Sequence, residues 1–88
     1  MITTGAPAAD THIADLRQRI DQIDEQLIAL WRERAGISQE VGATRVAAGG
    51  TRLNLSREGE IIDRFREALG EDGTPLALLI LRAGRGRL

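Results

Sequence analysis

Apolar residues recur every three or four positions along the first half of the chain and predict one long amphipathic helix over residues 13–45, capped by Asp10 or Thr11. The stripe consists of Ile13, Leu16, Ile20, Ile23, Leu27, Leu30, Arg34, Ile37 and Val41. A heptad pattern of this kind is typical of a helix that packs along its length against another helix. The glycine pair Gly49–Gly50 predicts where the helix ends.

Two shorter helices are predicted after this pair. The apolar face of the first consists of Ile61, Ile62, Phe65 and Leu69. We expect Ser56 to cap this helix, which then runs to about Leu69. A turn over residues 70–73 follows, and Thr74 with Pro75 predicts the start of a last helix that ends at Gly84. No segment has a strand pattern, so the expected fold is all-α, with one long and two shorter helices.

The predicted long helix is too long for the remaining residues of one chain to cover its apolar stripe. A helix of about 33 residues spans roughly 50 Å, whereas a compact chain of 88 residues is roughly 30 Å across. Part of the apolar stripe therefore needs a partner, most simply a second copy of the chain. We expect a homodimer built from a domain over residues 10–84. Residues 1–9 and 85–88 are expected to be flexible tails.

Composition narrows the classes of function. The chain has 12 basic and 13 acidic residues and a net charge of −1, without the basic excess that is usual for nucleic-acid-binding domains. It contains no cysteine, which excludes thiolate chemistry and fits a reducing, cytoplasmic location. No stretch approaches the roughly 20 apolar residues of a membrane span. We expect no nucleic-acid and no membrane partner.

Arginines interrupt the apolar stripe, where a permanent charge is costly unless an anion meets it. Arg34 occupies a stripe position, Arg45 falls where the stripe would continue, and Arg17 lies beside it. Arg34 and Arg45 share a helix face about 16 Å apart, whereas Arg17 is about 25 Å from Arg34 and could meet it only across an antiparallel dimer. Arg57 and Glu58 begin the next helix, where backbone N–H groups attract anions.

Each of these arginines also has a structural interpretation. An arginine in a heptad stripe can reach to solvent or set the register of a helical dimer, and Arg57 alone fits a solvated surface residue. The chain would then be a non-catalytic dimerisation or adaptor module. The arginines taken together, with the glycines and the adjoining loop, favour an anion-binding site instead.

The positions of these arginines resemble those of the all-α chorismate mutases. Residues 16–24, LRQRIDQID, are similar to the family's opening L-R-x-x-I-D-x-x-D. The match continues through Leu27, Leu30, Arg34, Ile37, Val41, Gly42, Arg45, Ser56, Arg57 and Glu58. The glycine pair followed by TRL, and the C-terminal segment LRAGRGRL, resemble the small actinobacterial subclass. An isochorismate-pyruvate lyase shares this fold and stays an alternative.

The resemblance implies the Claisen rearrangement of chorismate to prephenate, on the shikimate route to phenylalanine and tyrosine, without metal or cofactor. It implies an intertwined homodimer in which Arg34 and the partner's Arg17 bind carboxylates. It also implies that Arg45 lies beside the breaking ether bond. Arg57 would add a carboxylate contact, and Glu58 would accept a hydrogen bond from the substrate hydroxyl. The loop positions implied for the site are Thr51, Leu53 and Asn54.

The chain departs from the family pattern in its last helix. Many members carry a glutamine or glutamate there that also reaches the ether oxygen, whereas residues 76–82 read LALLILR. The resemblance to the small subclass implies weak activity alone and activation by 3-deoxy-D-arabino-heptulosonate 7-phosphate (DAHP) synthase. We expect that partner to contact the segment Arg85–Leu88.

Overall fold

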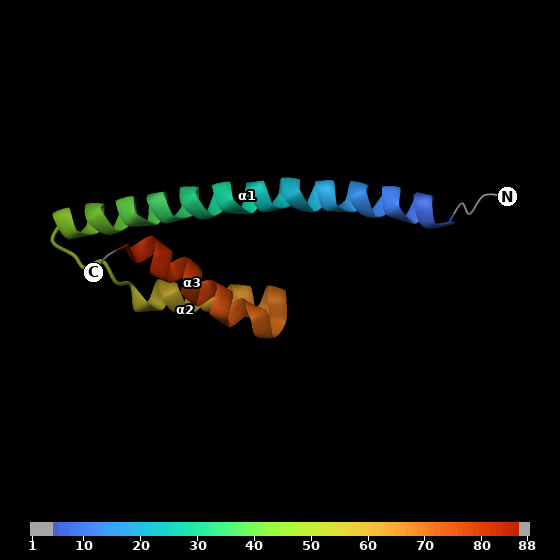
Figure 1. The fold of residues 1–88 in the computed structure, drawn as a ribbon. Coiled ribbons are helices and arrows are strands. Elements are labelled where there is room, and N and C mark those ends of the chain that lie inside the picture. Colours follow the sequence, from blue (N-terminus) through green and yellow to red (C-terminus); the bar gives the residue numbers. More distant parts are fainter. Residues whose placement is uncertain (1–4, 87–88) are drawn as a thin grey trace. The chain divides into compact units, whose positions relative to one another are not determined.

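The computed structural model describes residues 5–86, which are helical almost throughout (Figure 1). They form α1 (Gly5–Ala47), α2 (Leu55–Leu69), a 3₁₀ turn η1 (Gly70–Asp72) and α3 (Gly73–Arg85). Residues 5–86 contain no strand, and no helix among them is long and apolar enough to cross a membrane. The predicted all-α fold with one long and two shorter helices is confirmed. The chain divides into two compact units at the boundary between Leu30 and Trp31.

Helix α1 begins earlier than expected. It starts at Gly5 rather than after a cap at Asp10 or Thr11. Pro7 permits this start, because N–H groups in the first helical turn have no intrahelical acceptor and proline already has a helical φ. The hydroxyl of Thr11 donates to the carbonyl of Pro7 at 2.9 Å. Residues 5–9 therefore belong to the helix and not to an N-terminal tail, and residues 1–4 lie outside the described part.

The other end of α1 lies where the glycine pair predicts it. The helix ends at Ala47, and Gly49 has a φ of 90°, which is a conformation that favours glycine. The N–H of Gly50 donates to the carbonyl of Arg45 at 2.8 Å. This turn closes the helix and directs the chain into the loop before α2.

The N-terminal unit is a stretch of α1 without a core of its own. All described side chains from Pro7 to Leu30 are exposed, and Leu16, Leu27 and Leu30 are at least 50% exposed. Fully burying a leucine side chain contributes roughly 1.5–3 kcal/mol, so covering the exposed half of one contributes roughly half of that amount. An apolar stripe of this length is a surface on which another molecule packs.

In the C-terminal unit α2 and α3 lie side by side (Figure 1). Ile61 of α2 and both Ala77 and Leu81 of α3 are buried. Gly73 makes the tight junction between the helices possible, because a Cβ atom there would lie 2.1 Å from the carbonyl oxygen of Phe65. Only glycine allows the two backbones to approach this closely.

The start of α2 differs from the expectation by two residues. Asn54, not Ser56, caps the helix: its side-chain oxygen accepts the N–H of Arg57 at 3.1 Å. Asparagine and serine are both good caps, so the sequence contains two candidates two residues apart. Arg57 and Glu58 are then the third and fourth residues of α2 and stay in its first turn, near the positive end of the helix dipole.

The start of α3 also differs. The helix begins at Gly73, directly after η1, and no side chain caps it. The expected cap, Thr74, is already inside the helix. Pro75 is the third helical residue and not the first, which is still within the turn whose N–H groups lack intrahelical acceptors. The prediction of a helix that starts near this proline was correct, and the predicted cap was wrong.

The C-terminal end of α3 corrects the prediction of a tail over residues 85–88. Gly84 does not end the helix; it is buried within it, and the helix includes Arg85. Gly86, with a φ of 68°, is the residue that ends it. Arg85 is therefore part of the folded unit, whereas residues 87–88 lie outside the described part.

Candidate active site

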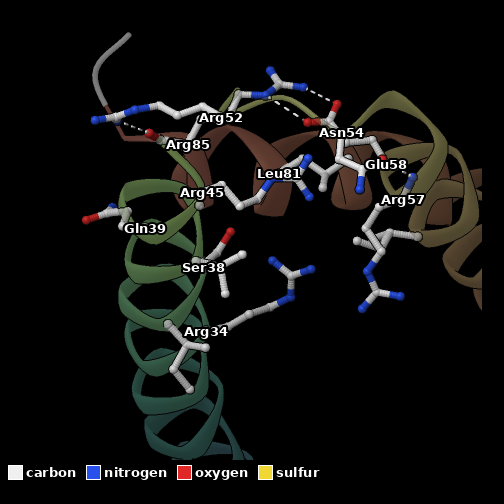
Figure 2. A pocket seen from close by; sticks show the side chains of 15 residues that line it. Arg34, Ser38, Gln39, Arg45, Arg52, Asn54, Arg57, Glu58, Leu81 and Arg85 are labelled. Carbon is white, nitrogen blue, oxygen red and sulfur yellow. Dashed lines mark hydrogen bonds and ion pairs between the residues drawn. The ribbon is translucent and has the colours of Figure 1, made fainter. Parts of the chain in front are cut away.

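A cavity of about 300 Å³ lies within the C-terminal unit, between the end of α1, the following loop, α2 and α3 (Figure 2). Its charged lining residues are Arg34, Arg45, Arg52, Arg57, Arg85 and Glu58. Five guanidinium groups against one carboxylate make this cavity strongly cationic in a chain whose net charge is −1. Guanidinium groups bind carboxylates through paired hydrogen bonds, so the cavity suits a small molecule with more than one carboxylate.

The structure brings most of the residues predicted for the site together. Those that line the cavity are Arg34, Arg45, Asn54, Arg57 and Glu58. Thr51 and Leu53 do not line it; the hydroxyl of Thr51 donates to the carbonyl of Leu53 at 2.9 Å and shapes the loop. Arg17 belongs to the N-terminal unit, where its side chain is exposed.

Arg34 is the most constrained of these cations. One terminal nitrogen, Nη1, is buried and has no hydrogen-bond partner within residues 5–86. Burial lowers the pKa of Arg34, and the neighbouring charges of Arg57 and Arg64 lower it further. An unsatisfied buried donor costs roughly 1–3 kcal/mol, more when it is charged. The fold therefore keeps a cation in a place where an anionic ligand would stabilise it.

Arg45 and Arg57 reach the same cavity from different elements. The Nε of Arg45 donates to the carbonyl of Thr51 at 3.1 Å, so one bond to the loop fixes the base of its guanidinium group. Arg57 pairs with Glu60 at 3.7 Å on the surface, an exposed contact that contributes little. In Figure 2 the side chains of Arg34, Arg45 and Arg57 extend toward one another.

Glu58 is held by Arg85, which the sequence predicts to lie in a C-terminal tail. Arg85 donates from Nε to Oε2 of Glu58 at 3.1 Å and from Nη2 to Oε1 (Figure 2). Hydrogen bonding to Glu58 raises the pKa of Arg85, although burial acts in the opposite direction and lowers it. Leu81 and Arg85 are one helical turn apart and line the same cavity. The spacing of four residues between Leu81 and Arg85 is the sequence signal that could have identified Arg85 as a residue of the site.

Gly84 sets the distance between α3 and α1 beside Arg34. A Cβ atom at this position would lie 2.5 Å from Oγ and 2.8 Å from Cβ of Ser38. We expect Gly84→Ala to lower the free energy of unfolding by about 1–3 kcal/mol, the usual range for overpacking. Urea unfolding at a fixed protein concentration measures this difference.

The matched control for this substitution is Gly59→Ala in α2, where an added Cβ meets nothing within 4 Å. It should raise the free energy of unfolding by up to about 1 kcal/mol through helix propensity. A Gly84→Ala variant as stable as the parent protein would show that α1 and α3 are not in close contact at this point.

Comparison with known proteins shows to which family this chain belongs. Residues 16–80 match the model of chorismate mutase type II. The chain belongs to the type II chorismate mutase family. It is 50% identical over 76 residues to the intracellular chorismate mutase of Mycolicibacterium smegmatis, covering 86% of this chain and 73% of that one. It is also 50% identical over 82 residues to the intracellular chorismate mutase of Mycobacterium tuberculosis, covering 93% and 73%.

A solved structure supports the same assignment. The chain superposes with a TM-score of 0.87 and 44% identity on one chain of a solved structure, a non-covalent complex of DAHP synthase and chorismate mutase from Corynebacterium glutamicum with a bound transition state analogue. The match covers 93% of this chain and 99% of the matched chain. The predicted chorismate mutase activity, an isomerase reaction, and the resemblance to the actinobacterial subclass are thus confirmed. Neither the adaptor nor the lyase alternative gains support from these relatives.

Proposed function

We propose that the cavity works as a chorismate mutase site by binding both carboxylates of chorismate with arginines. The observation that carries this proposal is the buried Nη1 of Arg34, which finds no acceptor among residues 5–86. A carboxylate beside it would supply the missing acceptor. It would also offset the repulsion from Arg57 and Arg64 that lowers the pKa of Arg34. The first carboxylate therefore lies between Arg34 and Arg57.

The bond changes of the reaction explain why a cationic pocket is sufficient. The ether C–O bond breaks while a C–C bond forms within the same molecule, so no proton or co-reactant is exchanged. The rate depends on holding a compact conformer and on stabilising negative charge as it grows on the ether oxygen. Arg45 supplies a permanent cation for that oxygen, at an orientation set by its bond to the Thr51 carbonyl.

The remaining predicted site residues have supporting roles in this mechanism. Glu58 accepts a hydrogen bond from the substrate hydroxyl. Asn54 lines the cavity and, as the cap of α2, fixes the first turn that carries Arg57 and Glu58. Thr51 and Leu53 act indirectly, by holding the shape of the loop to which Arg45 is bonded.

A second copy of the chain completes the site. The exposed stripe of the N-terminal unit, with Leu16, Leu27 and Leu30 at least 50% exposed, supports a homodimer in which the helices cover one another. Arg17 is adjacent to this stripe at Leu16. In the dimer the partner's Arg17 binds the second carboxylate, so each site contains residues of both copies.

The relatives also indicate an assembly and a location for this chain. The Corynebacterium glutamicum relative of known structure is in a complex with DAHP synthase. We infer the same partner for this chain, with contacts at the C-terminal end of α3 and the residues that follow it. The mycobacterial relatives are named as intracellular chorismate mutases, which supports an intracellular location.

The experiment that tests the proposed function follows chorismate loss and prephenate formation by absorbance, with pyruvate measured in parallel. A mutase forms one prephenate for each chorismate and releases no pyruvate. Pyruvate formation from isochorismate, without prephenate from chorismate, would support the lyase alternative. The same assay with DAHP synthase added tests the proposed assembly, which predicts a higher rate in the complex.

A further inference from the structure

We propose that Arg85 is a positioning residue that holds the Glu58 carboxylate at the wall of the pocket, away from the arginines that bind substrate. The proposal rests on the proposed function of the same pocket. It concerns how the last turn of α3, which lacks the polar ether contact common in the family, still contributes to the site.

The contact between the two side chains is well suited to this role. Arg85 engages both oxygens of Glu58, and the two side chains are only 31% and 16% exposed. A bidentate pair fixes the plane of the carboxylate as well as its position. Each oxygen keeps another lone pair, so Glu58 can still accept a hydrogen bond from a substrate hydroxyl.

Arg85 is itself held in place through the backbone of α3. The last carbonyl groups of a helix have no intrahelical donors. Here Gln39 of α1 donates from Nε2 to the carbonyl of Ala83 at 3.0 Å. Arg52 of the loop donates from Nη1 to the carbonyl of Arg85 at 3.4 Å. The last turn of α3 is therefore bonded to α1, to the loop and, through its side chain, to Glu58 of α2.

The charges of the pocket give a reason for holding Glu58. Among the described residues that line the cavity it is the only acid, and it faces several arginines. A carboxylate free to rotate there would pair with Arg34 or Arg45 and compete with the carboxylates of the substrate. Because Arg85 already pairs with Glu58, the substrate-binding arginines keep their charge for the ligand. We expect the loss of Arg85 to weaken substrate binding more than it slows the chemical step.

The test is a double-mutant cycle on the full-length homodimer, with kcat and KM measured for chorismate. Arg85→Gln should raise KM about tenfold, the scale of one charge-assisted hydrogen bond, with kcat changed less. Arg85→Lys keeps a cation and should recover most of this loss. In a Glu58→Gln background, where no carboxylate is left to compete, Arg85→Gln should change KM by less than about twofold. Arg82→Gln, an exposed arginine of the same helix, is the matched control and should behave like the parent.

Three results would overturn the proposal. An equal rise of KM in both backgrounds would mean that Arg85 acts through the fold and not through Glu58. An unchanged KM in Arg85→Gln would remove the role altogether. An increase of kcat/KM would mean that the ion pair restrains the site.

The proposed function is tested separately by Arg34→Ala. If that variant keeps parental turnover, the proposed function of the pocket is wrong, whatever the outcome of the cycle.

Discussion

Arg34→Ala should lower kcat/KM for chorismate by about 10³-fold, the upper end for the loss of one preorganised donor group. Arg34 is expected to show the largest effect because its buried Nη1 has no acceptor within residues 5–86 until a ligand supplies one. Arg34→Lys keeps the charge but cannot bind a carboxylate with two parallel bonds, so it should recover only part of the activity. Initial rates at several chorismate concentrations give the comparison.

Stability distinguishes a functional Arg34 from a structural one. A buried cation without a partner destabilises the free protein, so Arg34→Ala should unfold at the same urea concentration as the parent or a higher one. Arg64→Ala, which removes an exposed neighbouring charge, is the matched control and should keep nearly full activity. A variant Arg34→Ala that is active, or that is inactive only because it is unfolded, would contradict the assigned role.

Arg45→Ala should lower kcat by roughly 10²-fold, with a smaller change in KM. The reason is that Arg45 is assigned to the charge that develops on the ether oxygen, and such an interaction is stronger in the transition state than in the ground state. Arg45→Lys keeps a cation and should retain part of the rate. The bond from Nε to the carbonyl of Thr51 is lost in both variants.

The comparison of these two variants therefore separates the charge from the loop contact. If Arg45→Lys is as slow as Arg45→Ala, the bond to the loop matters more than the cation. A variant Arg45→Ala with parental kcat would show that the stabilisation of the ether oxygen comes from another residue.

The repetition of apolar residues was enough to predict the helices, because a period near 3.6 specifies both the helix and the face that packs. The same reasoning placed Arg34 and Arg45 on one face, and both line the cavity. Helix ends were less predictable. Asn54 and Ser56 are equally good caps in isolation, and in the structure it is Asn54 whose side chain accepts the N–H of Arg57.

The C-terminal part of the site could not be predicted for a related reason. Gly84 and Gly86 both look like helix ends in the sequence. Packing against Ser38 decides between them, because there is no space for a Cβ atom at Gly84. The sequence therefore predicts Arg85 in a tail, whereas in the structure it donates to Glu58. In the loop, the sequence does not reveal which side chains face inward. Thr51 and Leu53, which the family resemblance implies for the site, do not line the cavity, whereas Arg52 does.

If each site combines Arg34 of one copy with the partner's Arg17, mixing two inactive variants should restore activity. Arg17→Ala and Arg34→Ala should each be nearly inactive, and sedimentation should show both as dimers. After subunit exchange at equal concentrations, random pairing makes about half of the molecules heterodimers, each with one intact site. The mixture should therefore recover roughly a quarter of the parental chorismate turnover. No recovery after verified exchange would mean that both arginines serve the site of a single chain, which contradicts the shared site.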